Sequence, residues 1–181
     1  SRFLRTHPGA TILYNLICSR AVPEVIAELG GKGIRTKNGH SFMKQIMAET
    51  GAVFAGEHSG HYYFADNYRA DSGLIATMGV LGEMCHTGKS LSQMREPLER
   101  YASSGEINTT VDDIHAVIER IALDYSSYSQ DRVDGLTVDC GSWWFNVRAS
   151  NTEPLLRLNL EASTRDECDT HVVELLASIT A

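Results

Sequence analysis

The spacing of hydrophobic residues changes several times along the first half of the chain, and each kind of spacing predicts a strand or a helix. Residues 10–18 are mostly apolar, which is typical of a strand that is covered on both faces. Residues 40–50 place Phe42, Ile46 and Met47 on one face at helical spacing. The chain therefore opens with a buried strand and carries an amphipathic helix some 30 residues on.

The other elements of the first half follow from glycine and proline positions and from short apolar runs. We expect helices over 23–30 and 69–88, a short strand within 31–39, and two strands over 51–57 and 61–64 around a tight turn. The order β-α-β-α-β-β-α is typical of an α/β domain built in layers.

The second half has a different pattern. A strand over 105–111 precedes a helix over 112–125, a hairpin pairs 135–140 with 143–149, and a helix over 164–180 closes the chain. In residues 154–162 apolar side chains alternate with polar ones, as in an antiparallel strand with one buried face. Thr164 suits the N-cap of the last helix, with Glu167 placed as in a capping box. The order β-α-β-β-β-α predicts a small α+β domain with two helices covering an antiparallel sheet.

The two halves are separated by a polar segment. Residues 88–106 contain Pro97 and a Ser-Ser-Gly turn, and the composition changes after them. We predict an α/β domain over residues 1–96, a linker over 97–106 and an α+β domain over 107–181.

Composition narrows the classes of function. The formal net charge is -7, which argues against a nucleic-acid partner, although a few local cations can still bind a small anion. There is no long apolar run and no signal-peptide pattern, so we expect a cytoplasmic protein with no membrane partner. The four cysteines lack zinc-site spacing, and we expect no metal site in this chain.

The stretch RASNTEP, residues 148–154, is the first candidate for chemistry. It lies in the connection between two predicted strands. Arg148 offers a planar fork of donors that matches a phosphate, and Ser150, Asn151 and Thr152 add further donors. Backbone N–H groups of a tight turn can add an anion-binding nest. The alternative is an ordinary polar hairpin turn.

The stretch GEHSGH, residues 56–61, is the second candidate. Glu57 can accept hydrogen bonds from sugar hydroxyls, and Ser59 can donate or accept them. A serine-hydrolase elbow has another spacing, and a zinc site built on His58 and His61 would need further ligands. An ordinary exposed turn remains the alternative.

The stretch KNGH, residues 37–40, is the third candidate. His40 stands at the start of a predicted helix, where free N–H groups and the helix dipole favour an anion. It could serve as a donor or a proton shuttle, or simply begin the helix without a ligand. Trp143 and Trp144 are adjacent on a predicted strand, so they face opposite ways and one of them is expected in the core.

The order of these motifs carries more information than any one of them. TKNGHSFMKQIM, then GAVFAGEHSGHYYF, then RASNTEPLLRLNLEA resembles the α-D-phosphohexomutase superfamily, in particular its bacterial phosphomannomutase/phosphoglucomutase branch. The resemblance extends over essentially the whole chain. It implies that the chain corresponds to most of the third domain and all of the fourth domain of a four-domain enzyme, with the first domains missing. The absence of an initial methionine fits this expectation.

The resemblance implies a role for each matching residue. The sugar hydroxyls are expected to contact Glu57, Ser59, His61 and His40. The substrate phosphate is expected to contact Arg148, Ser150, Asn151 and Thr152, and Lys37 is added for its charge and its position beside the KNGH turn.

The resemblance also implies a reaction for the complete enzyme. A phosphoserine gives its phosphate to a hexose phosphate, the 1,6-bisphosphate turns around in the cleft, and the other phosphate returns to the serine. The phosphoserine loop and the Mg²⁺-binding loop of the family do not occur in this chain, so we expect Mg²⁺ and glucose or mannose 1,6-bisphosphate to serve the full-length enzyme only. The expected partners are hexose phosphates and the missing domains.

One sequence feature indicates which branch of the superfamily the chain resembles, and another departs from the pattern of its bacterial relatives. Glucosamine-mutase relatives usually carry glycine where this chain has Asn151, so the chain looks more like the mannose/glucose branch. Bacterial relatives often carry lysine where Ile17 stands, and Arg20 is the cation nearest to that place. Three alternatives stay open: a phosphoglucosamine mutase, a sugar-phosphate-binding module without catalysis, and a structural protein with coincidental motifs.

Overall fold

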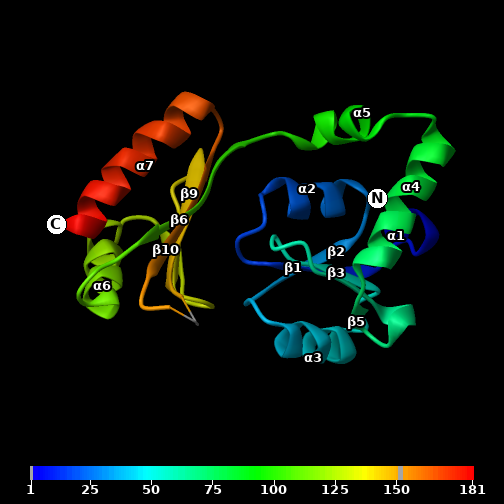
Figure 1. The fold of residues 1–181 in the computed structure, drawn as a ribbon, viewed down its shortest axis with the longest axis horizontal. Coiled ribbons are helices and arrows are strands. Elements are labelled where there is room, and N and C mark those ends of the chain that lie inside the picture. The colour runs from blue at the N-terminus through cyan, green and yellow to red at the C-terminus, as the bar shows by residue number, and fades with distance from the viewer. Residues whose placement is uncertain (1, 151–152) are drawn as a thin grey trace. The chain divides into compact units, whose positions relative to one another are not determined.

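The computed structural model describes residues 2–150 and 153–181, which form two compact units over residues 1–100 and 101–181 (Figure 1). Unit 1 contains α1 (Arg2–Thr6), β1 (Thr11–Asn15), α2 (Ala21–Glu28), β2 (Lys32–Thr36), α3 (His40–Thr50), β3 (Phe54–Gly56), β4 (Tyr62–Phe64), η1 (Ala65–Asn67), β5 (Ala70–Asp71), α4 (Gly73–Thr87), α5 (Leu91–Arg95) and η2 (Glu96–Leu98). Unit 2 contains β6 (Ala102–Thr109), α6 (Ile114–Asp124), β7 (Ser129–Asp131), β8 (Leu136–Asp139), β9 (Trp143–Ala149), β10 (Leu156–Ala162) and α7 (Arg165–Thr180).

Unit 1 is a layered α/β unit around a mixed sheet of order β2-β1-β3-β4-β5. Strands β2 and β3 pair parallel with β1, and β4 and β5 continue the sheet antiparallel. Helices α2 and α3 lie on opposite sides of the sheet (Figure 1). Leu13 packs with Met43 of α3, whereas its neighbour Ile12 packs with Ile26 of α2. Because side chains alternate along a strand, β1 is covered on both faces, as its apolar run predicts.

Two details of unit 1 differ from the sequence-based prediction. Helix α3 has the predicted bounds, but it buries Met43 and Met47, and Phe42 is 40% exposed. Helix α4 begins at Gly73 rather than at residue 69, because Tyr68 and Arg69 adopt the left-handed backbone conformation and β5 follows them. Helix α4 buries none of its residues.

Unit 2 is an antiparallel sheet of order β6-β10-β9-β8-β7 with α6 and α7 against it. The fold class of both units is as predicted, with β7 as an additional strand. Leu156, Leu158 and Leu160 of β10 lie in the core together with apolar residues of α6 and α7. Thr164 accepts a hydrogen bond from the Glu167 N–H, which confirms the N-cap of α7.

The other face of the unit 2 sheet is polar, yet several of its side chains are buried. On β9, Trp143 belongs to the core and stacks on His171, whereas Trp144 lies on the polar face and donates to Glu161 at 3.0 Å. Asn146 is fully buried and donates to the backbone carbonyls of Asp134 and Leu136. Among the described residues, no helix is long and apolar enough to cross a membrane.

Candidate functional site

The sequence-predicted residues of unit 1 gather at one edge of its sheet. Strands β1, β2 and β3 run parallel and end at Asn15, Thr36 and Gly56, with Asn15 opposite Thr36 and Tyr14 opposite Gly56 in register. The segments that follow β2 and β3 therefore leave the sheet side by side. They are the KNGH and GEHSGH motifs. The carboxyl ends of parallel strands are where open α/β sheets bind ligands.

Asn15, at the end of β1, holds these segments together. Its side-chain amide donates to Asn38 Oδ1 at 2.5 Å, and its Oδ1 accepts from the backbone N–H of His58 at 3.1 Å. Oδ1 also accepts from the Cys18 thiol at 2.9 Å. Asn15 is 2% exposed. One buried amide thus fixes the segments after all three parallel strands.

Glu57 is buried, and both of its carboxylate oxygens accept hydrogen bonds. Oε1 accepts from the backbone N–H of Gly39 at 3.1 Å, and Oε2 accepts from the Tyr63 hydroxyl at 2.8 Å. Gly39 has a φ of 128°, in the region that favours glycine. Glu57 therefore ties the KNGH turn to the hairpin of β3 and β4. Each oxygen keeps a further lone pair for a ligand.

Tyr63 links Glu57 to His40 and determines the tautomer of the imidazole. The Tyr63 hydroxyl lies 2.9 Å from His40 Nδ1 and has a single hydrogen, which it donates to Glu57. His40 Nδ1 must then carry a hydrogen and donate it to the hydroxyl. The His40 Nε2 atom is left as an acceptor when the ring is neutral. Burial, then the hydrogen bond to Glu57, raises the pKa of Tyr63, so the hydroxyl keeps its hydrogen at physiological pH.

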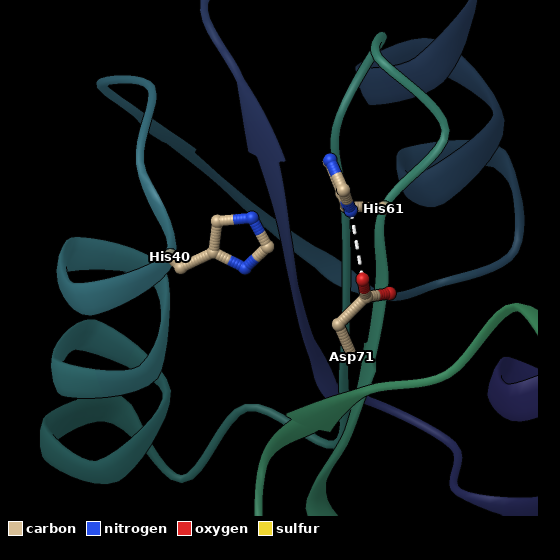
Figure 2. A group of neighbouring side chains, drawn as sticks. All are labelled: His40, His61 and Asp71. Atoms are coloured by element: carbon tan, nitrogen blue, oxygen red, sulfur yellow. Dashed lines mark hydrogen bonds and ion pairs between the residues drawn. The ribbon is translucent and has the colours of Figure 1, made fainter.

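His61 is oriented by a different carboxylate. Its Nδ1 lies 2.7 Å from Asp71 Oδ2, and Asp71 Oδ1 accepts from the Tyr62 N–H at 2.8 Å. The hydrogen bond from His61, reinforced by that from Tyr62, lowers the pKa of Asp71. The rings of His40 and His61 are 4.5 Å apart between centroids, in an edge-on arrangement (Figure 2).

His40, His61 and Asp71 also lie close enough to suggest a metal site, but their contacts do not fit Mg²⁺. The ligand atoms of the three lie within 4.8 Å of one another. The Nδ1 atoms of both histidines are already engaged, one with Tyr63 and the other with Asp71. Mg²⁺ takes oxygen ligands, and this group offers two imidazoles and one carboxylate. The cluster is better described as two oriented imidazoles at the surface.

The other predicted residues of unit 1 occupy the rim of this edge. Ser59 is exposed at the tip of the turn between β3 and β4. The Lys37 ammonium lies 3.5 Å from the centre of the Phe42 ring. This cation–π contact covers part of the exposed Phe42 ring on α3.

In unit 2, Arg148 and Ser150 lie at the base of the hairpin between β9 and β10. Arg148 belongs to β9 itself rather than to the loop, and it is 5% exposed. Ser150 donates its backbone N–H to Leu155 at 2.8 Å and accepts from the Glu153 N–H at 3.3 Å. Asn151 and Thr152 lie outside the described residues.

Three residues that bring the unit 1 group together were not predicted. Tyr63 sits in an apolar run that reads as a plain strand, and Asn15 ends another such run. Asp71 lies within what the pattern predicts to be a helix. The pairing of β4 with β3 and β5 places Tyr63 and Asp71 beside the motifs, and the pairing of β1 with β2 and β3 places Asn15 there.

Comparison with known proteins identifies both units. Residues 1–101 match the family model described as phosphoglucomutase/phosphomannomutase, alpha/beta/alpha domain III, and residues 106–178 match the C-terminal domain of the same family. Unit 1 thus corresponds to domain III, and unit 2 to the C-terminal domain, of one class of protein, the phosphohexose mutases. The chain belongs to the phosphoglucomutase/phosphomannomutase family.

Individual relatives agree with this assignment. A phosphomannomutase of Methanocaldococcus jannaschii is 41% identical over 172 residues, which cover 95% of this chain and 38% of the relative. A phosphoglucomutase/phosphomannomutase family protein of Burkholderia thailandensis has a TM-score of 0.81 at 29% identity, over 98% of this chain and 39% of its own. The N-acetylphosphoglucosamine mutase of Aspergillus fumigatus, solved with GlcNAc-6P and magnesium, shares the fold at 12% identity, with a TM-score of 0.70 over 96% of this chain and 42% of its own. This chain spans about two-fifths of their length.

Proposed function

We propose that this chain is the part of a hexose-phosphate mutase that binds the sugar hydroxyls and the substrate phosphate. The observation that carries the proposal is the grouping of Glu57, His40 and His61 at the carboxyl edge of the unit 1 sheet. Glu57 and His61 come from the GEHSGH motif and His40 comes from the KNGH motif, and Tyr63 connects Glu57 directly to His40. The complete enzyme would interconvert hexose 6-phosphate and hexose 1-phosphate.

In this proposal Glu57, His40 and His61 of unit 1, together with Ser59, bind the hydroxyl groups of the sugar. The exposed Ser59 hydroxyl contacts the sugar, together with the Nε2 atoms of His40 and His61, for which the described part of the chain offers no hydrogen-bond partner. Glu57 is 7% exposed and holds the KNGH turn in place, so it contacts a sugar hydroxyl through its remaining lone pairs. A rigid group of donors and acceptors discriminates hydroxyl positions because a misplaced hydroxyl leaves buried polar atoms unpaired.

The RASNT loop of unit 2 is proposed to hold the phosphate that does not react. Arg148, Ser150, Asn151 and Thr152 supply donors without a metal, which suits a phosphate monoester that must be held and then released. Lys37, whose ammonium lies over the Phe42 ring, is proposed as a further cation for the phosphate. Because a 1,6-bisphosphate carries a phosphate at each end, one loop can hold either end.

Phosphoryl transfer itself is assigned to other parts of the full-length protein. When bound there, Mg²⁺ offsets the charge that develops on the transferred phosphoryl group. The chain described here contributes binding and orientation. A phosphoserine intermediate for the complete enzyme is part of the proposal and follows from the family resemblance.

The experiment is a titration of glucose 1,6-bisphosphate into the isotope-labelled chain, followed by backbone amide shifts in NMR spectra. We expect shifts at residues 57–61 and at Arg148 and Ser150. Arg148→Gln should abolish the shifts of the unit 2 loop, and Ser59→Ala should reduce those of residues 57–61. Shifts confined to surfaces outside both motifs, or none at millimolar ligand, would contradict the proposal.

A further inference from the structure

Two arginines lie directly opposite each other on the polar face of the unit 2 sheet. Arg148 of β9 pairs with Arg157 of β10 in the antiparallel register. Like charges in that position repel and destabilise a sheet unless something separates them. Arg148 is almost fully buried, and the Arg157 side chain is 23% exposed. Such a pair therefore needs an anion.

Glu106 of β6 supplies one carboxylate for both guanidinium groups. Its Oε2 accepts from Arg148 Nη2 at 2.9 Å, and its Oε1 lies 3.2 Å from Arg157 Nη1. Glu153 lies 3.8 Å from Arg157, but its side chain is 59% exposed and the pair is screened by water. Two cations thus share one partly buried carboxylate, whose side chain is 28% exposed. The two guanidinium groups and Glu106 together carry one net positive charge, and the exposed Glu153 offsets it only through a screened contact.

The same group has donors to spare. The buried Nε atoms of Arg148 and Arg157 have no hydrogen-bond partner within the described part of the chain. A guanidinium has five N–H donors, and buried donors are normally paired. Arg148 uses only Nη2 in the bond to Glu106. A buried cation with unused donors, at the base of the loop proposed to hold a phosphate, is arranged to accept a second anion.

We propose that Arg157 and Glu106 complete the phosphate site around Arg148, an inference that rests on the proposed phosphate-binding function. Glu106 is a positioning residue that fixes the Arg148 guanidinium. Arg157 provides the second positive charge, without which Glu106 would neutralise Arg148. The ligand class is a phosphate monoester dianion. The arrangement holds a phosphate by charge and still lets it leave, since Glu106 remains a competing acceptor for Arg148.

The first test measures binding of inorganic phosphate to the 181-residue chain at several salt concentrations by isothermal titration calorimetry. Arg157→Gln should weaken binding about tenfold and flatten its salt dependence, because the net charge of the group falls. Arg157→Lys should restore both, since it keeps the charge. Arg165→Gln is the matched control: Arg165 pairs with Asp169 beyond the opposite end of β10 and should change neither.

The second test concerns Glu106. Glu106→Ala should weaken phosphate binding about fivefold, although it removes a negative charge, because Arg148 loses its anchor. Glu106→Gln keeps an acceptor oxygen and should bind phosphate at least as tightly as the unsubstituted chain. Equal binding by the alanine and glutamine variants would overturn the positioning role.

The variant Arg148→Gln separates this inference from the proposed function. If it leaves phosphate binding unchanged, the proposed phosphate site itself is wrong. If it abolishes binding while Arg157→Gln has no effect, only the further inference fails. If the glutamine and lysine variants of Arg157 weaken binding equally with an unchanged salt dependence, Arg157 is merely structural and the inference is overturned.

Discussion

At the scale of single residues, Tyr63 has the most consequences because one hydroxyl serves both Glu57 and His40. Tyr63→Phe removes the donor to a buried carboxylate. We expect a loss of about 1–3 kcal/mol in the free energy of unfolding, measured by urea denaturation. Tyr62→Phe, at the exposed neighbouring position, is the control and should stay within about 0.5 kcal/mol of the unsubstituted chain. Equal stability of the two variants would show that the Tyr63 hydroxyl does not support the site.

Asp71 gives unit 1 a defined acid response. Its pKa is lowered by the hydrogen bonds from His61 and Tyr62, so the carboxylate stabilises the fold above its unfolded pKa of about 3.9. That contribution is lost as the pH falls through the lower folded value. We expect Asp71→Asn to flatten the decline of the thermal midpoint as the pH falls below about 4. The exposed Asp66, mutated to Asn, is the control. An unchanged decline in the Asp71 variant would contradict the assignment.

At the scale of elements, the turn before β8 depends on Gly135. Its φ is 69°, and a Cβ there would lie 2.3 Å from the Val147 carbonyl oxygen and 2.6 Å from Arg148 Cβ. Gly135→Ala should therefore cost several kcal/mol in the free energy of unfolding and weaken phosphate binding, because the clash is with the strand that carries Arg148. Gly141 has a φ of 88° and open space around an added Cβ. Gly141→Ala therefore measures only the cost of the left-handed backbone conformation, about 1 kcal/mol in the free energy of unfolding. Similar losses in both variants would contradict the steric argument.

Most helices and strands, and several residues of the candidate site, could be predicted from the sequence. The predictions that were wrong or missing have physical reasons. The bounds of α3 were right because glycines flank the helix. Its predicted face was right at Met47 and Ile46 but wrong at Phe42, whose place in the core is taken by Met43. A stripe through Met43 fits the helical period as well as one through Phe42, and the packing against the sheet decides between them. The motif histidines and Glu57 could be found from local pattern. The Tyr63 and Arg157 contacts could not, because strand pairing creates them.

Helix α4 presents an apolar stripe at helical spacing that the described residues leave uncovered. Leu74, Met78 and Leu81 are 75%, 61% and 47% exposed. Contiguous apolar surface of this kind promotes association. We expect the chain to self-associate in sedimentation experiments and the double variant Leu74→Glu, Met78→Lys to be monomeric. Val173→Lys, which replaces an exposed apolar residue of α7, should leave the association unchanged. A chain that stays monomeric at high concentration would contradict this expectation.

At the scale of the whole molecule, we expect this chain to bind the ligand and other parts of the full-length protein to carry out phosphoryl transfer. The proposed sugar and phosphate groups lie within this chain, whereas the proposed phosphoserine and Mg²⁺ site do not. We therefore expect the 181-residue chain to bind glucose 1,6-bisphosphate but to convert no glucose 1-phosphate in the presence of Mg²⁺, measured in a coupled assay. Turnover that depends on Arg148 would contradict this division of labour and place the reacting group within the chain.

The adjacent pair Trp143 and Trp144 makes unit 2 its own optical reporter. They are the chain's two tryptophans, and they face opposite sides of one strand. The indole of Trp143 senses the packing of the core beside His171, while that of Trp144 shares the polar face with Arg148 and Arg157. Selective excitation of tryptophan therefore records events in unit 2 and is silent about unit 1. With Trp144 replaced by phenylalanine, the fluorescence of Trp143 would report on the folding of the core. With Trp143 replaced instead, the fluorescence of Trp144 would report on ligand binding at the polar face.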